Sequence, residues 1–95
     1  MSNLKGILDK CKIGKTIIYT GNTVTTGDID FATQSYVVMV ENEELVVIDM
    51  DKIEKIIIPK NAGISDLEVK KLKTIKNISV KKVLQLNLVI DLFPF

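Results

Sequence analysis

Apolar residues near the start of the chain recur at the spacing of a helix. They stand at positions i, i+3, i+4 and i+7, as Leu4, Ile7, Leu8 and Cys11. This spacing places them on one helical face, with Ser2 as a possible cap and Gly14 as a stop. The pattern predicts an N-terminal helix in which Cys11 is a small core residue and not a reactive thiol.

From residue 15 onward, the period of the pattern changes to two, which is typical of strands. The sequence predicts five strands, at 16–20, 23–30, 36–40, 44–48 and 53–58. Gly21-Asn22 fits a two-residue hairpin turn of type II′. Residues 31–35 are expected to form a loop or sharp bend, and Pro59 is expected to end the fifth strand.

Several predicted strands carry neighbouring apolar residues in place of a strict alternation. Examples are Val37-Val38, Val46-Val47 and the run Ile56–Ile58. Strands that are apolar on both faces need a second apolar layer. Either the helices or another subunit would supply that layer.

The C-terminal third predicts one helix and one more strand. Ser65 and Glu68 have the spacing of a capping box, so we expect a helix over 66–77. Apolar and polar positions then alternate from Leu84 to Leu92. This alternation predicts a long strand that pairs inside the chain or is donated to a neighbour.

The composition limits the chemistry that is open to the chain. Its 95 residues predict one domain, 1–95. Without histidine and with one cysteine, it lacks a Ser-His or Cys-His nucleophile pair, an imidazole metal ligand and an internal disulfide. The aspartate pairs Asp28/Asp30 and Asp49/Asp51 are interpreted as solvated strand ends. We therefore expect no enzyme, no metal site and no cofactor.

The net charge of +1 conceals a segregation along the chain. In residues 1–27 four lysines against one aspartate give +3, and in 28–54 eight acids against one lysine give −7. In residues 55–95 eight lysines against three acids give +5. Opposite faces of this kind favour head-to-tail self-association, and the alternative is a surface whose signs mix in three dimensions.

No segment has the character of an export signal or a membrane span. The first twenty residues carry lysine and aspartate throughout, and Val83–Ile90 is the longest uncharged stretch near the C-terminus. Together with the single cysteine, this predicts a cytoplasmic protein without a membrane partner.

The densest basic cluster lies in and after the predicted C-terminal helix. Its members are Lys70, Lys71, Lys73, Lys76, Lys81 and Lys82. The cluster is a candidate surface for RNA or another acidic partner, but a solvated helix face has the same pattern and is the simpler interpretation. All basic residues are lysines, which bind phosphate as point charges, so weak affinity is expected. Phe31 and Tyr36 border one loop and form a candidate stacking platform, or pack in the core.

The acidic turn between the third and fourth predicted strands is a second candidate surface. It carries Glu41, Glu43 and Glu44. Such a turn could dock a protein partner, which would make the chain an inhibitor or adaptor.

An N-terminal helix followed by five short antiparallel strands resembles the Sm-like family of SH3-type barrels. The resemblance covers residues 4–58, with Gly14-Lys15-Thr16 opening the first strand and Gly27-Asp28-Ile29 in a bent second strand. Asp51-Lys52-Ile53 would lie near the turn between the last two barrel strands. The resemblance implies assembly into rings through the edge strands of the barrel, and binding of uridine-rich or adenine-rich RNA.

Together these patterns predict a mainly β fold with α elements. The core would be a small, five-stranded antiparallel SH3/Sm-like barrel over 4–58, extended by a helix and a strand over 64–95. The expected function is that of a non-catalytic binding and assembly module, which is homo-oligomeric. The alternatives are weak RNA binding through the lysine cluster and a protein-binding inhibitor or adaptor.

Overall fold

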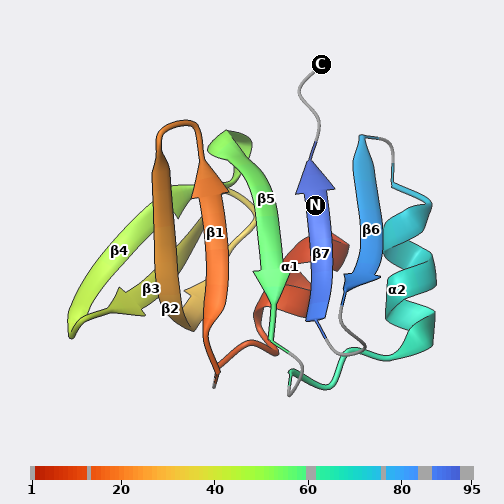
Figure 1. Cartoon of the computed structure of the whole chain (residues 1–95), viewed down its shortest axis with the longest axis horizontal. Helices are drawn as coiled ribbons and strands as arrows, with labels where there is room; N and C mark the ends of the chain where they lie inside the picture. The colour runs from red at the N-terminus through yellow and green to blue at the C-terminus, as the bar shows by residue number, and fades with distance from the viewer. Residues whose placement is uncertain (1, 13, 60–61, 76, 84–86, 93–95) are drawn as a thin grey trace.

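The computed structural model describes residues 2–12, 14–59, 62–75, 77–83 and 87–92. It contains two short α-helices, one turn of 3-10 helix and seven strands (Figure 1). The helical segments are α1 (Ser2–Leu8), η1 (Met50–Lys52) and α2 (Asp66–Lys73). The strands are β1 (Thr16–Thr20), β2 (Thr23–Ala32), β3 (Tyr36–Glu41), β4 (Glu44–Asp49), β5 (Ile53–Ile58), β6 (Ile78–Val83) and β7 (Asn87–Leu92).

All seven strands form one antiparallel sheet in the order β4-β3-β2-β1-β5-β7-β6. The mainly β class is therefore confirmed, but the sheet is open where a closed five-stranded barrel was expected. The reason is that β5 pairs with β1 on one side and with β7 on the other. Both of its edges are occupied, so β4 stays at one edge of the described sheet and β6 at the other.

Paired residues in antiparallel strands share a face, so the register separates two faces of the sheet. The inner face, which carries α1, includes the row Thr25, Ile18, Ile56, Ile90 and Val80. The outer face includes the row Thr26, Ile17, Ile57, Val89 and Lys81.

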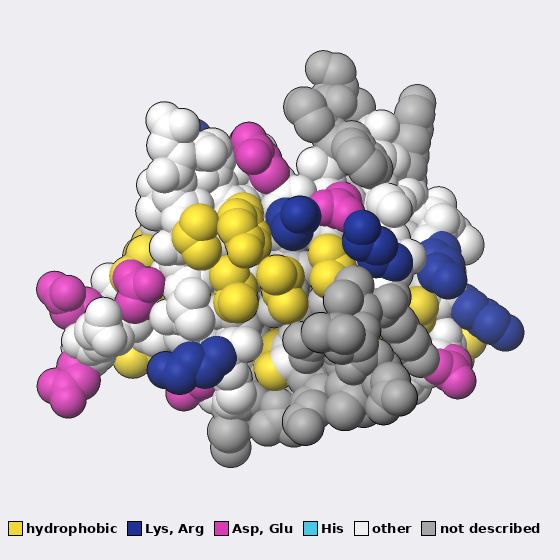
Figure 2. Space-filling model, viewed as in Figure 1, with side chains coloured by type: hydrophobic (Ala, Val, Ile, Leu, Met, Phe, Trp, Pro, Cys, Tyr) yellow, Lys and Arg dark blue, Asp and Glu magenta, His cyan; other side chains and the backbone are white. Residues whose placement is uncertain are grey.

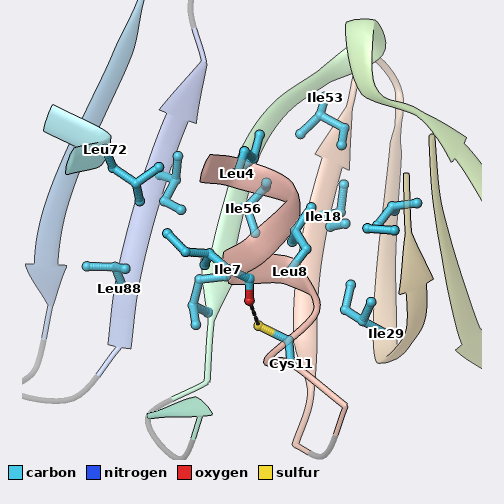
Figure 3. Packing of buried hydrophobic residues seen from close by; sticks show 14 of the residues in the cluster. Leu4, Ile7, Leu8, Cys11, Ile18, Ile29, Ile53, Ile56, Leu72 and Leu88 are labelled. Atoms are coloured by element: carbon cyan, nitrogen blue, oxygen red, sulfur yellow. Dashed lines mark hydrogen bonds between the residues drawn. The ribbon is translucent and has the colours of Figure 1, made fainter. Parts of the chain in front are cut away.

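The core lies between the inner face and the two helices (Figure 3). Leu4, Ile7 and Leu8 on α1 are almost fully buried against the strands, and Leu72 on α2 belongs to the same cluster. The consecutive apolar residues thus receive one layer from the helices on the inner face.

The N-terminal helix is shorter than the expected span to Cys11. After Leu8 the chain tightens, because the amides of Lys10 and Cys11 donate to the carbonyls three residues earlier. The carbonyl of Cys11 then accepts a hydrogen bond from Ile29 N at 3.0 Å. Cys11 remains fully buried, as the sequence predicts.

Strand β2 is longer than expected, since Phe31 and Ala32 belong to it and only residues 33–35 form the loop. The register of β2 with β3 shifts between Ile29 and Phe31, which marks a bulge at Asp30. The loop is held by the Thr33 hydroxyl, which accepts hydrogen bonds from the amides of Ser35 and Tyr36, both at 3.1 Å.

The C-terminal part departs furthest from expectation. The capping box is confirmed, since Ser65 N donates to Glu68 Oε1 at 3.1 Å and Glu68 N donates to Ser65 Oγ at 3.2 Å. However, α2 ends at Lys73, and Ile78–Val83 forms β6, which was not predicted. Of the expected strand over 84–92, the described residues form β7, which pairs inside the chain with both β5 and β6.

Candidate binding surfaces

Large apolar side chains are exposed on the outer face where β2, β3 and β4 lie side by side. The outer patch, as we call it, comprises Phe31, Val40, Leu45 and Val47. Leu45 is 68% exposed and Val47 is 63% exposed, both on β4. The register aligns Val40 with Leu45, so the patch is continuous from β3 to β4. The helices lie on the inner face and do not cover it (Figure 1).

The outer patch borders an unpaired strand edge. Strand β4 is the last strand on its side of the described sheet, so its outward amides and carbonyls have no ladder partner there. An exposed edge strand with apolar residues is a template for pairing with another chain. The edge offers backbone hydrogen-bonding groups and the patch offers apolar side chains. Together they therefore form one surface that can bind another chain.

The acidic turn at the tip of β3 and β4 is a two-residue hairpin with unfavourable local chemistry. Asn42 and Glu43 both have positive φ, at 51° and 68°. Glycine is preferred at the second of these positions, but Glu43 occupies it. Glu41 and Glu44 stand directly opposite each other, which places two like charges at one pair.

The three glutamates of the turn differ in surroundings. Glu43 and Glu44 are exposed, whereas Glu41 is half-buried and accepts a hydrogen bond from Thr26 N at 3.1 Å. Glu41 thus ties the turn to β2. Glu43 and Glu44 remain the acidic groups that can meet a partner.

Phe31 and Tyr36 are in contact, as their places beside one loop suggested. Their ring centroids lie 6.2 Å apart with the planes at 72°, an edge-to-face arrangement. Phe31 is 42% exposed and Tyr36 is half-buried. The rings pack on each other instead of forming a flat platform, and Phe31 contributes its free side to the outer patch.

The lysines of the basic cluster are divided between two elements. Lys70, Lys71 and Lys73 are exposed on α2, and Lys81 is exposed on the outer face of β6. Lys82 lies in β6, paired with Leu88, but its side chain is outside the description, as is all of Lys76. In Figure 2 dark blue side chains gather toward β6 and α2, and magenta ones project at the end where β3 meets β4.

The outer face between these two ends is apolar at its centre, over β1 and β5 (Figure 2). On one side of this area, Lys55 Nζ lies 5.6 Å from the ring centroid of Tyr19 and 4.0 Å from Asp91 Oδ1. The lysine thus bridges an aromatic ring and a carboxylate across β1, β5 and β7. This arrangement links neighbouring strands and leaves Lys55 already partnered.

The titratable groups of the described residues do not assemble into a metal-binding group. No cluster of three or more carboxylate or cysteine side chains is found there that could hold a metal ion. Burial raises the pKa of the Cys11 thiol to about 11, although the neighbouring Thr16 side chain opposes the shift. The thiol is therefore protonated at neutral pH, and it donates to the carbonyl of Ile7 at 3.4 Å (Figure 3).

Comparison with family models, curated proteins and solved structures finds no match to this chain. Neither of the two described α-helices is long or apolar enough to span a membrane.

Sequence reasoning missed the outer patch as a surface. The signal was present, because the pairs Val37-Val38 and Val46-Val47 showed that β3 and β4 are apolar on both faces. Their inner members are covered by the core, but Val47 is not. Leu67 on α2, at 62% exposed, was also missed.

Proposed function

We propose that this chain is a non-catalytic binding and assembly module that forms a homo-oligomer through the outer patch and the free edge of β4. The observation that carries the proposal is the exposure of Leu45 and Val47 on an edge strand. Burying the exposed part of these two side chains removes apolar surface from water, which favours association by less than about 1.5–3 kcal/mol each. A second copy supplies the apolar layer that the helices do not provide on this face.

The Sm-like resemblance agrees with this proposal in part. The resemblance rests on an N-terminal helix followed by five short antiparallel strands with a bent second strand, and in this chain α1 precedes β1 to β5 and β2 carries a bulge. The resemblance implies assembly through both edges of the five-stranded unit. In this chain β7 occupies the edge of β5, so only β4 is available from that unit. A ring of this chain therefore needs a different second surface.

Weak RNA binding is the second candidate function. It is favoured by the exposed lysines of α2 together with Lys81. Lysine contacts to phosphate weaken steeply as salt increases. The inhibitor or adaptor function and the cytoplasmic location stay predictions from the sequence.

The proposal is tested by placing charge on the patch. The patch variant, Leu45→Lys/Val47→Lys, is expected to lower the sedimentation-equilibrium mass to that of one chain, 10.6 kDa. The control variant Thr23→Lys/Ser79→Lys adds the same charge at two exposed strand positions outside the patch, so it is expected to keep the wild-type mass. Equal masses for the wild type and the patch variant would contradict the proposal.

A further inference from the structure

The outer patch lies beside an acidic turn. At the other end of the molecule, a second exposed apolar side chain lies beside lysines. Of the large apolar side chains that are exposed in the described part of the chain, all except Leu67 lie on β2, β3 or β4. Leu67 lies on α2, beside the opposite edge strand of the sheet (Figure 1). Apart from the apolar centre of the outer face, the outer patch and Leu67 thus place exposed apolar side chains at opposite ends of the described sheet.

Leu67 shares the outward face of α2 with two lysines. Lys70 and Lys71 follow it by three and four residues, which places the three side chains together on the helix surface. Val69 and Leu72 occupy the opposite, buried face of the same helix. The α2 face, as we call Leu67, Lys70 and Lys71, therefore has an apolar centre with two lysines beside it, and Asp66 lies one turn before Lys70.

The exposed end of β4 also combines apolar side chains with charge, but its charge is negative. Leu45 and Val47 form its apolar part on the outer face, and the turn at its tip carries the exposed Glu43 and Glu44, of which Glu44 lies on the opposite face of the strand. The two surfaces match in apolar content and are opposite in sign, which is the complementarity that steers and orients association. The net charge of the chain is only +1, so two copies do not repel strongly at long range.

We infer that the α2 face of one copy docks on the exposed end of β4 of a second copy, with Lys70 and Lys71 against Glu43 and Glu44. This inference rests on the proposed function and names the second surface that a ring of this chain needs. The two surfaces differ, so the contact is heterologous and each copy uses both. Repeated contacts of this kind produce a ring if the rotation closes and a filament if it does not.

The local chemistry of the acidic turn supports the same inference. The facing pair Glu41 and Glu44, and Glu43 at positive φ, both disfavour the isolated hairpin. Positions that break a local rule without compensation within the domain are expected at functional sites. Lysines from a second copy would offset the repulsion between these carboxylates.

The test is a charge exchange followed by light scattering. The helix variant Lys70→Glu/Lys71→Glu and the turn variant Glu43→Lys/Glu44→Lys each place like charges across the contact, so each alone is expected at the mass of a monomer. An equimolar mixture restores opposite charges at every contact and is expected to recover the wild-type mass. The control Lys73→Glu/Lys81→Glu changes the net charge as much as the helix variant does, and it is expected to keep the wild-type mass. Circular dichroism verifies that each variant is folded.

The outcomes separate this inference from the proposed function. If the helix variant keeps the wild-type mass while the patch variant becomes monomeric, assembly stands and the α2 face is not the second surface. The inference is also overturned if both charge variants are monomeric and their mixture remains so. It is overturned as well if the helix variant loses only affinity for a uridine oligonucleotide, because the lysines then serve RNA. A monomeric wild type would overturn the proposed function and the inference with it.

Discussion

Gly27 in β2 lies so close to the carbonyl oxygen of Val40 in β3 that a Cβ at position 27 would overlap it. The two strands cross closely there, just before the bulge at Asp30. Only glycine leaves room for this approach. The close pairing of β2 with β3, whose Val40 belongs to the outer patch, depends on this contact.

Replacing Gly27 with alanine is therefore expected to destabilise the fold. The Cβ meets backbone atoms that cannot rotate away, so we expect a loss of roughly 1–3 kcal/mol in the free energy of unfolding. Urea denaturation measures it. Gly6→Ala is the matched control, because no atom lies within 4 Å of a Cβ at Gly6 in α1. That control is expected to gain about 0.5–1 kcal/mol from helix propensity. A Gly27→Ala variant as stable as the wild type would contradict the close crossing.

Glu43→Gly is expected to stabilise the monomeric fold. Glu43 has φ of 68°, and the change creates the Asn-Gly pair that two-residue hairpins prefer. We expect a gain of about 1 kcal/mol in denaturation at a concentration at which the chain is monomeric. Glu44→Gln removes the like-charge pair without changing the backbone preference and separates the two effects. A loss of stability in Glu43→Gly would show that the glutamate is held by a contact within the fold.

Stability is expected to fall at high pH through Cys11. The pKa of its thiol is raised by burial from 9.0 to about 11, so the folded chain holds this proton more tightly than the unfolded chain. The resulting stabilisation is fully present below pH 9 and is lost as pH rises toward 11. Cys11→Ala removes this dependence, so the stability difference between wild type and variant is expected to shrink over that range. A constant difference from pH 8 to 11 would contradict the raised pKa.

Stability is also expected to fall at low pH through Glu68. Its pKa is lowered from 4.5 to about 2, mainly by the hydrogen bond from Lys10 and then by the amide of Ser65. The folded chain therefore keeps the carboxylate ionised to lower pH, and the stabilisation is present above pH 4.5 and lost as pH falls toward 2. Glu68→Gln retains the capping box but loses the ion pair with Lys10, whose atoms lie 2.6 Å apart. Because the pair is solvent-exposed, we expect the free energy of unfolding to fall by only about 0.2–1 kcal/mol at pH 7. We also expect it to depend less on pH in the acid range than it does in the wild type. An unchanged slope of stability against pH between 4.5 and 2 would contradict this assignment.

The strands of the first half could be predicted because their period of two is a local property. The hairpin Tyr36–Asp49 and the capping box of Ser65 and Glu68 are likewise set by neighbours in sequence. Strand β6 was missed because the adjacent Lys81 and Lys82 break its alternation. The prediction of a closed barrel was wrong because β7 pairs with the edge of β5. No local sequence pattern specifies which strand pairs with a given edge.

The charged residues of the candidate surfaces could be predicted from the sequence, but the arrangement of the surfaces in space could not. Glutamates 43 and 44 and the α2 lysines could be identified because charges of one sign cluster along the sequence. For the outer patch the sequence indicated only that β3 and β4 are apolar on both faces, and the position of β4 at the sheet edge is what leaves Leu45 and Val47 exposed. Exposure of this kind depends on whether a helix or another layer covers that face of the sheet.

The central claim is that the chain associates with itself, and the mass of the wild-type protein in solution tests it most directly. Light scattering on a size-exclusion column over a range of loading concentrations is expected to give a mass several times 10.6 kDa, which decreases on dilution. A mass of 10.6 kDa at every concentration would contradict self-assembly and would leave the exposed end of β4 as a surface for a different protein.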